Sequence, residues 1–208
     1  AEIQPGSGIS SFKLENNGAL ERDDSNKILS VGITAMAMDF PDGGIYATKG
    51  SGLLKTGSNE SAIHDSLPSD WVDDFLAYND GRYNKIIAIT QSKLNLINDS
   101  QLVGEIALPK ADCWMSCLAV APSRPDDGYK KPKTSGYLQL EAHLGKQRIL
   151  YVGTRGQGLW MFSNGRWSNF TSRDSPLPSN NINKIYYLHG ADKLAILSDG
   201  GLTMLGID

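Results

Sequence analysis

A Gly-rich motif recurs along this chain, and its recurrence limits the fold more than any other feature of the sequence. Thr48–Leu53 reads TKGSGL and Thr154–Leu159 reads TRGQGL, and each follows a short apolar run. Weaker copies begin at Thr90 and Ser198, so the hydroxyl residues stand 42, 64 and 44 positions apart. A period of 42–44 residues indicates a repeat architecture, in which each unit buries its apolar surface against its neighbours.

A second repeated element precedes the motif and fixes the phase of the repeat. Leu67–Asp70 (LPSD) and Leu177–Asn180 (LPSN) are turn sequences, and each leads into an apolar segment. Each repeat is therefore expected to contain four strands, which we call the inner, second, third and outer strand from the axis to the rim. Inner strands are expected at 31–39, 71–78, 115–121 and 181–188, and second strands at 44–48, 85–90, 148–154 and 194–198. Third strands are expected at 9–14, 52–56, 93–97, 158–162 and 202–206, and outer strands at 19–23, 101–107, 166–170 and near 60–65.

Four short strands in a repeat of this length are typical of a β-propeller blade. Helical repeats have similar periods, but no long stretch shows clean helical periodicity, and Asn-Gly hairpin turns occur at Asn17 and Asn164. The prediction is an all-β fold, a β-propeller with about four visible blades in a single domain over 1–208. Both a small closed ring and part of a larger ring remain open, and a ring closed within the chain requires 19–23 to pair with 202–206.

The longest step of the repeat contains an insertion between the inner and second strands of the third unit. Residues 122–147 are rich in Pro, Gly, Lys and Asp, which predicts a long inserted loop outside the common core. Because loop-closure entropy changes slowly with length, shortening such a loop should cost little stability.

The repeat resembles that of the two-component regulator propeller family. The resemblance rests on Tyr151–Leu159, Trp167–Phe170 and Leu177–Asn180, and it is good over about 148–205 and partial over 31–97. It departs at the second strand, where the family usually has tryptophan and this chain has Tyr46 or Tyr151. The resemblance implies a many-bladed propeller in the extracytoplasmic sensor portion of a bacterial signalling protein. It implies no catalytic residue.

Composition excludes several classes of function. The formal net charge is −3 and the pI is near 5.6, so the chain has no overall positive potential that would attract nucleic acid. No segment approaches the roughly 20 apolar residues of a membrane-spanning helix, so no membrane insertion is expected. Two cysteines in 208 residues exclude a disulfide scaffold.

Few residue patterns point to chemistry. Cys113 and Cys117 could be two semi-buried thiols, a local disulfide or half of a metal site, and no second pair completes a zinc site. His64, His143 and His189 show no metal-ligand spacing. The acidic pairs lack the spacing of a calcium loop and are interpreted as solvated turns: Asp23–Asp24, Asp73–Asp74 and Asp126–Asp127. No cofactor, metal or catalytic residue is therefore predicted.

Propeller geometry does predict a binding site. The outer-to-inner and second-to-third connections gather on one face around the axis, and polar groups that converge on a cavity mouth are a default binding hypothesis. The predicted ligand-binding residues are Lys49, Ser51, Gln91, Lys93, Arg155, Gln157 and Asp199.

Three functions remain as hypotheses. The first is a non-enzymatic recognition or sensor propeller that binds a protein or a small ligand on one face. The second is a structural subunit that completes a propeller or assembly with a partner chain at the blade edge. The third is a carbohydrate-active propeller enzyme, a lyase or hydrolase, which requires paired carboxylates or a His-Tyr-Arg cluster at the mouth. Asp199 is the single acid in the predicted site, which disfavours glycoside hydrolysis.

Overall fold

In the residues that it describes, the computed structural model is an all-β structure with one short helix. It describes residues 2–4, 8–14, 20–28, 33–40, 43–48, 50, 52–55, 61–62, 67, 71–79, 84–90, 92–110, 112–122, 134–145 and 148–207. Within these residues the strands form antiparallel sheets, and each sheet takes its strands from consecutive positions in the sequence. The expected all-β fold is confirmed.

Three of the sheets have four strands each. The first contains β4 (Ile33–Phe40), β5 (Gly43–Thr48), β6 (Leu53–Lys55) and β7 (Ser61–Ala62). The second contains β8 (Asp74–Asn79), β9 (Asn84–Thr90), β10 (Lys93–Asn98) and β11 (Gln101–Ala107). The third contains β12 (Met115–Pro122), β13 (Arg148–Thr154), β14 (Leu159–Ser163) and β15 (Arg166–Phe170).

Two further sheets have three described strands each. At the N-terminal side, β2 (Gly8–Leu14) pairs with both β1 (Glu2–Gln4) and β3 (Leu20–Ile28). At the C-terminal side, β17 (Lys193–Ser198) pairs with both β16 (Ile182–Leu188) and β18 (Gly201–Gly206). These strands lie close to the ranges that the repeat predicts, except β1, where no strand is expected from the sequence.

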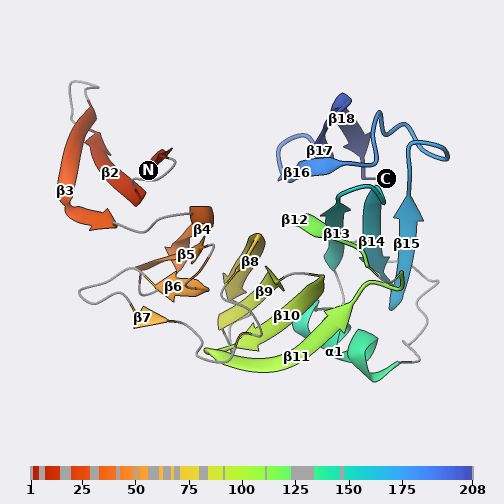
Figure 1. Cartoon of the computed structure of the whole chain (residues 1–208), viewed down its shortest axis with the longest axis horizontal. Helices are drawn as coiled ribbons and strands as arrows, with labels where there is room; N and C mark the ends of the chain where they lie inside the picture. Colours follow the sequence, from red (N-terminus) through yellow and green to blue (C-terminus); the bar gives the residue numbers. More distant parts are fainter. Residues whose placement is uncertain are drawn as a thin grey trace.

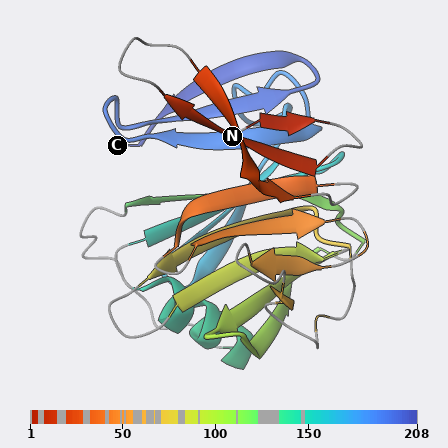
Figure 2. The same cartoon turned by 90° about the vertical axis from the view of Figure 1, so that its left-hand side faces the viewer.

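The sheets follow one another around a common centre (Figure 1), and Figure 2 views the same arc from the side of β1–β3. The inner strands are in contact in order, β4 with β8, β8 with β12 and β12 with β16. This arrangement is consistent with part of a β-propeller, but the described residues form no closed ring. Within the described residues, β3 pairs only with β2 and β18 pairs only with β17, so the pairing of 19–23 with 202–206 expected for a ring closed within the chain is not found there.

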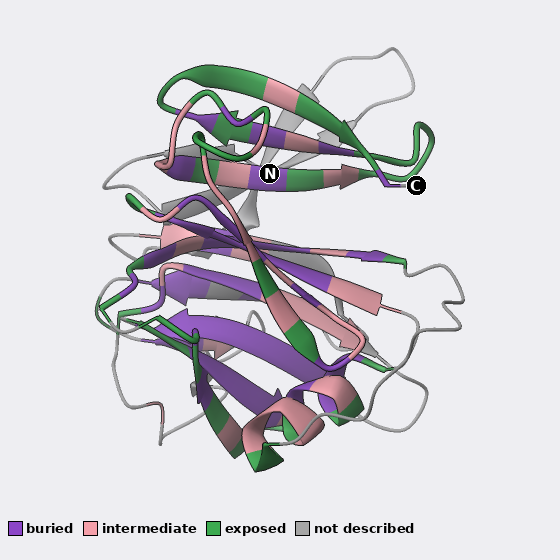
Figure 3. Ribbon diagram, turned by 90° about the vertical axis from the view of Figure 1, so that its right-hand side faces the viewer, coloured by how far each residue is buried: buried purple, intermediate pink, exposed green. Residues whose placement is uncertain are grey.

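The hydrophobic core lies between successive sheets. One cluster fills the space between β4–β7 and β8–β11, a second lies between β8–β11 and β12–β15, and a third lies between β12–β15 and β16–β18. Strands in the middle of a covered sheet are therefore buried on both faces, as in β9 and β13 (Figure 3). Such strands read as continuous apolar runs because neither face meets water.

At three of its four positions, the recurring hydroxyl residue of the sequence motif closes the turn after the second strand. Thr48 and Thr154 each donate their hydroxyl to the carbonyl four residues later, at 3.3 and 2.7 Å. Ser198 donates its hydroxyl to the Gly201 carbonyl, three residues later, at 3.1 Å, and Thr90 instead accepts from the Asn95 amide at 2.6 Å. The repeat is therefore a repeated turn geometry, and the motif marks its position in the fold.

The insertion is only partly the loop that the sequence predicts. Helix α1 (Ser135–Leu144) lies within it, and Leu140, His143 and Leu144 of this helix are buried. The helix contacts β11 and β13, and Leu140 and Leu144 belong to the core cluster of the neighbouring sheets. The expectation that the insertion stays outside the common core is therefore wrong for α1. Residues 123–133, 146 and 147 lie outside the described residues.

Candidate functional site

A cleft of about 480 Å³ lies between the inner strands of four sheets. It is lined by Thr34–Met36 of β4, Asp74–Leu76 of β8, Leu118–Val120 of β12, Lys184–Tyr187 of β16 and His189. The inner strands meet here because each is the edge strand of its sheet nearest the centre of the arc (Figure 1). The cleft is thus built by the repeat itself.

A shift in strand register recurs at the second residue of the inner strands. It occurs at Thr34 in β4, at Ser116 in β12 and at Asn183 in β16. The Thr34 hydroxyl donates to the Val72 carbonyl at 2.6 Å, and the Ser116 hydroxyl donates to the Ile182 carbonyl at 2.5 Å. Each bond joins one inner strand to the segment that begins the next, and therefore sets the spacing of the strands around the cleft.

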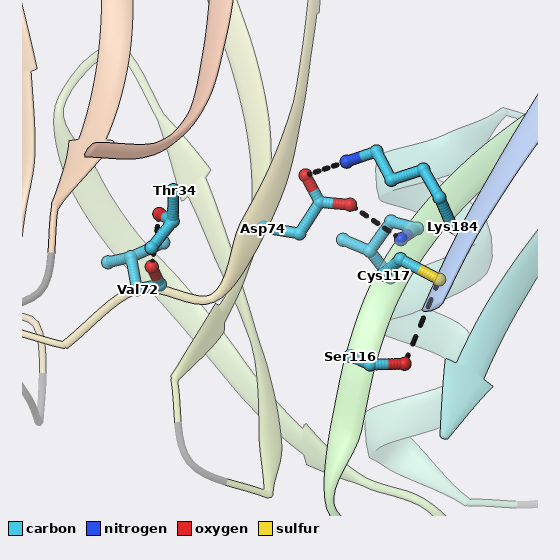
Figure 4. A network of polar contacts seen from close by, with 7 residues as sticks. Thr34, Val72, Asp74, Ser116, Cys117 and Lys184 are labelled. Atoms are coloured by element: carbon cyan, nitrogen blue, oxygen red, sulfur yellow. Dashed lines mark hydrogen bonds and ion pairs between the residues drawn. The ribbon is translucent and has the colours of Figure 1, made fainter. Parts of the chain in front are cut away.

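The position after this shift carries the polar groups of the cleft wall. Ala35, Asp74, Cys117 and Lys184 are equivalent, because each pairs with the residue before the recurring hydroxyl. The Lys184 Nζ donates to Asp74 Oδ1 at 3.0 Å (Figure 4). The side chain of Asp74 is 4% exposed and that of Lys184 is 32% exposed. The ion pair thus connects β8 with β16 across the sheet that lies between them.

The second oxygen of the same carboxylate is also engaged. Asp74 Oδ2 accepts a hydrogen bond from the Leu118 backbone N–H at 2.9 Å. A buried carboxylate needs such partners, because an unpaired charge in a low-dielectric site is costly. Asp74 therefore bonds to the next two sheets along the arc, β12–β15 and β16–β18.

Cys117 lies beside this ion pair without being activated by it. Burial is the main reason that the pKa of its thiol is raised to about 12; Asp74 acts in the same direction, whereas the Ser116 hydroxyl, 3.8 Å from Sγ, and Lys184 act against it. The thiol is therefore protonated at neutral pH and is a poor nucleophile. Cys113 is also a free, buried thiol whose pKa burial raises, and it packs in the cluster on the opposite side of β12. The structure contains the two thiols and no disulfide between them.

Aromatic residues stand at the end of the cleft where β16 ends. The rings of Tyr187 and His189 pack edge to face with centroids 4.5 Å apart. The Tyr187 hydroxyl donates to Asp192 Oδ1 at 2.8 Å, and this bond raises the tyrosine pKa. Tyr186 also lines the cleft and is exposed.

Two exposed tryptophans mark the opposite end, where the inner strands begin. Trp71 and Trp114 are both exposed, and each stands three residues before an equivalent inner-strand position, Asp74 in the cleft lining or Cys117 in the core. The Trp114 carbonyl accepts a hydrogen bond from the Arg155 N–H at 2.9 Å, so this residue lies against the turn between β13 and β14. The Trp71 indole N–H donates to Asp73 Oδ1 at 3.0 Å, so what this side chain offers to a ligand is the apolar area of its ring.

Asp199 lies at the same end and holds a small polar cluster. Its carboxylate accepts hydrogen bonds from the side-chain amides of Asn181 at 2.8 Å and Asn183 at 2.9 Å. The Asn183 and Asn181 bonds lower its pKa, and Arg155 lowers it further by charge attraction. Because Asn183 precedes Lys184, this cluster borders the cleft.

The structure brings together only part of the predicted ligand-binding set. Arg155 and Asp199 lie near each other, and the Gln157 carbonyl accepts from the Asn169 amide at 2.8 Å in the same turn. Lys93 instead forms an ion pair with Glu105 of the outer strand at 2.6 Å. Lys49, Ser51 and Gln91 lie outside the described residues. The binding role of the whole set stays a prediction.

Sequence reasoning missed the residues that best define this region. Asp74 was interpreted as part of a solvated turn, although it is buried, and Lys184, Trp71 and Trp114 were not singled out. A position-by-position alignment of the repeats contains the signal, because Asp74 and Lys184 occupy a position that holds Ala35 and Cys117 elsewhere. A charge at a position that is otherwise small and apolar indicates a specific partner.

Two classes of feature are not found in the described part of the chain. No group of three or more His, Cys, Asp or Glu side chains there is placed to hold a metal ion. No described helix has the length and apolar character that crossing a membrane requires.

Comparison with known proteins gives matches among solved structures only. No family model and no curated protein sequence matches the chain. The extracellular domain of BT4673 from B. thetaiotaomicron, described as part of a one-component or hybrid two-component system, aligns with a TM-score of 0.60 at 16% identity. This alignment covers 96% of the present chain and 25% of that protein chain.

A second similar structure is PorZ, a surface component of the type-IX secretion system of Porphyromonas gingivalis. It aligns with a TM-score of 0.57 at 14% identity over 97% of this chain and 29% of PorZ. At such identities the likeness establishes a shared fold and leaves function to the site. The chain spans only a quarter to under a third of the length of these structures.

Proposed function

We propose that the chain is a non-enzymatic recognition module of the sensor type, which binds a ligand or a protein on the face where the inner strands begin. The observation that carries this proposal is the pair of exposed tryptophans, Trp71 and Trp114, at equivalent positions beside the cleft. Aromatic residues that project from a rigid sheet scaffold are frequent anchors of binding sites. Arg155 and Asp199 add charged groups to the same face.

Recognition fits the chemistry of the cleft better than catalysis does. The carboxylate and the ammonium group of its wall are already bonded to each other, and Asp74 also accepts from the Leu118 N–H. A general acid or base needs a free proton position in reach of the substrate, and a nucleophilic cysteine needs a thiolate. Glycoside hydrolysis in particular needs two carboxylates, and Asp74 is the one carboxylate among the described residues that line the cleft.

An extracytoplasmic location and membership of the two-component regulator propeller family form part of this proposal. They are supported by the sequence resemblance over about 148–205 and by the fold shared with an extracellular domain of BT4673. The ligand is expected to be a small polar molecule or a short peptide with an apolar face for the indoles and polar groups for Arg155.

A thermal-shift screen of the 208-residue chain would test the proposal. The panel contains amino acids, dicarboxylates, mono- and oligosaccharides and short peptides, and compounds that raise the melting temperature are then measured by calorimetry. Replacing Trp71 or Trp114 with alanine should weaken binding about tenfold or more, as loss of a central aromatic anchor does.

The matched control is Val103→Ala, because Val103 is an exposed apolar residue on β11 and outside the proposed face. This variant should bind with unchanged affinity. A compound whose affinity is equal in the chain and in the Trp71→Ala and Trp114→Ala variants would place the binding site elsewhere.

A further inference from the structure

The last sheet carries an apolar face that nothing in the described structure covers. Its residues are exposed and large: Tyr186, Leu188, Leu197, Leu202 and Met204. They share one face, because Leu197 pairs with Leu202 and Ala195 pairs with both Tyr186 and Met204. Contiguous exposed apolar side chains of this kind mark an interaction surface in a folded protein. We call these five residues the open face.

The opposite face of the same sheet shows how such a sheet packs. Ile182, Leu194 and Ile196 are buried there against Cys117, Ala119, Tyr151 and Leu159 of β12–β14. The sheets β8–β11 and β12–β15 each have a leading face, which packs on the preceding sheet, and a trailing face, which receives the next one. The open face is the trailing face of β16–β18.

The open face occupies the same positions as the buried trailing face of β12–β15, with Lys184 standing where Cys117 is buried. Leu202 aligns with Leu159, because they pair with Leu197 and Gly153 at equivalent points of the second strand. Leu202 is 65% exposed, whereas Leu159 is 1% exposed. Tyr186 aligns with Ala119 in the inner strand, and their exposed fractions are 57% and 5%.

We propose that the open face is a docking surface for another β-sheet of the same repeat pattern, packed as β16–β18 packs on β12–β15. The partner surface is one with aliphatic side chains at the positions of Ile182, Leu194 and Ile196. This occupant is favoured because the open face continues an interface that recurs three times along the arc, with the same positions buried each time.

The test supplies this occupant from the sequence of the chain itself. A second copy of residues 171–207, which form the turn and strands of the last sheet, is joined directly after Ile207. Hydrogen exchange of the amides in the original β17 and β18 is compared between the extended and the unextended chain. Docking should slow exchange in these strands about tenfold or more, since local opening then exposes a second interface.

Two substitutions in the original sheet make the test specific. Leu202→Lys should restore fast exchange in the extended chain, because a charge is then buried in the new interface. Val103→Lys, a matched charge on exposed β11, should leave the protection intact. Sedimentation at the mass of one chain shows that the protection arises within the molecule.

Three results would overturn the inference. The first is unchanged exchange in β17 and β18 of the extended chain. The second is an appended sheet whose own amides stay unprotected, because a complementary face should order it. The third is binding of the unextended chain to phosphatidylcholine vesicles that Leu202→Lys abolishes, which would make the open face a membrane-binding surface.

Discussion

The ion pair between Asp74 and Lys184 is expected to stabilise the fold far more than a surface pair does. Replacing Lys184 with methionine leaves the Asp74 carboxylate almost fully buried without its cation, and should cost about 2–4 kcal/mol of unfolding free energy. Lys93→Met is the control, because the exposed pair of Lys93 with Glu105 should contribute no more than about 1 kcal/mol. Urea denaturation of both variants measures the difference, and equal small losses would contradict the structural role.

The Cys117 thiol is expected to be inert in the folded chain. Burial raises its pKa from 9.0 to about 12, so folding favours the protonated form. Because the pKa of this thiol is higher in the folded chain than in the unfolded chain, its contribution to stability is complete below pH 9 and is lost as the pH rises from about 9 to about 12. In a Cys113→Ser chain at pH 8, a thiol reagent should modify Cys117 at least about 100-fold more slowly when native than in urea. Similar rates in the two states would mean that the thiol is accessible in the folded chain.

At the scale of elements, helix α1 is expected to be part of the core. Leu140 is fully buried, so Leu140→Ala should cost about 2–5 kcal/mol, whereas Gln139→Ala on the exposed side should change little. The helix is further held by the Tyr78 hydroxyl and the Lys85 ammonium, which donate to the His143 carbonyl at 2.6 and 3.1 Å. Thermal melts of both variants check this, and a neutral Leu140→Ala would restore the view that the insertion is dispensable.

The turn motif makes a second prediction at this scale. Gly158 adopts a φ of +73°, and a Cβ there would lie 2.1 Å from the Phe170 carbonyl oxygen. Gly158→Ala should therefore cost more than about 1 kcal/mol, because it adds a steric clash to an unfavourable backbone conformation. Gly190→Ala is the control, since no atom would contact its added methyl group. Equal melting temperatures for the two variants would show that the turn can relax.

Elements were predictable from the sequence where one local geometry repeats. Thr48 and Thr154 each close a turn of the same geometry with a hydroxyl bond, so similar residue types recur at both turns. Helix α1 does not repeat, and Pro-, Gly- and Lys-rich residues surround it, so its apolar positions were hidden in a segment that reads as loop. The pairing of Asp74 with Lys184 spans 110 positions, which no local pattern can reveal.

At the scale of the whole molecule, the N-terminal sheet is expected to be separable from the rest. Its strands β1–β3 pair only with one another in the described structure, and β18 does not pair with them. Deleting residues 1–28 should therefore lower the melting temperature of the remaining chain by only a few degrees. Loss of the cooperative transition would instead show that the sheet is required by the others. A matching deletion of 171–208 should be far more damaging, because it uncovers Cys117, Ala119 and Leu159.

The hydrogen bond from Thr34 to Val72 connects β4–β7 to the next sheet, and the bond from Ser116 to Ile182 connects β12–β15 to the next sheet. Sheets that are connected only to their neighbours should unfold one at a time under mechanical load, with a separate force peak for each sheet. The ion pair between Lys184 and Asp74 joins β16–β18 directly to β8–β11, past the sheet between them, so these three sheets are held together as one group. Pulled from its two ends, the molecule should therefore release the last three sheets in one event, and Lys184→Met should split that event into smaller ones.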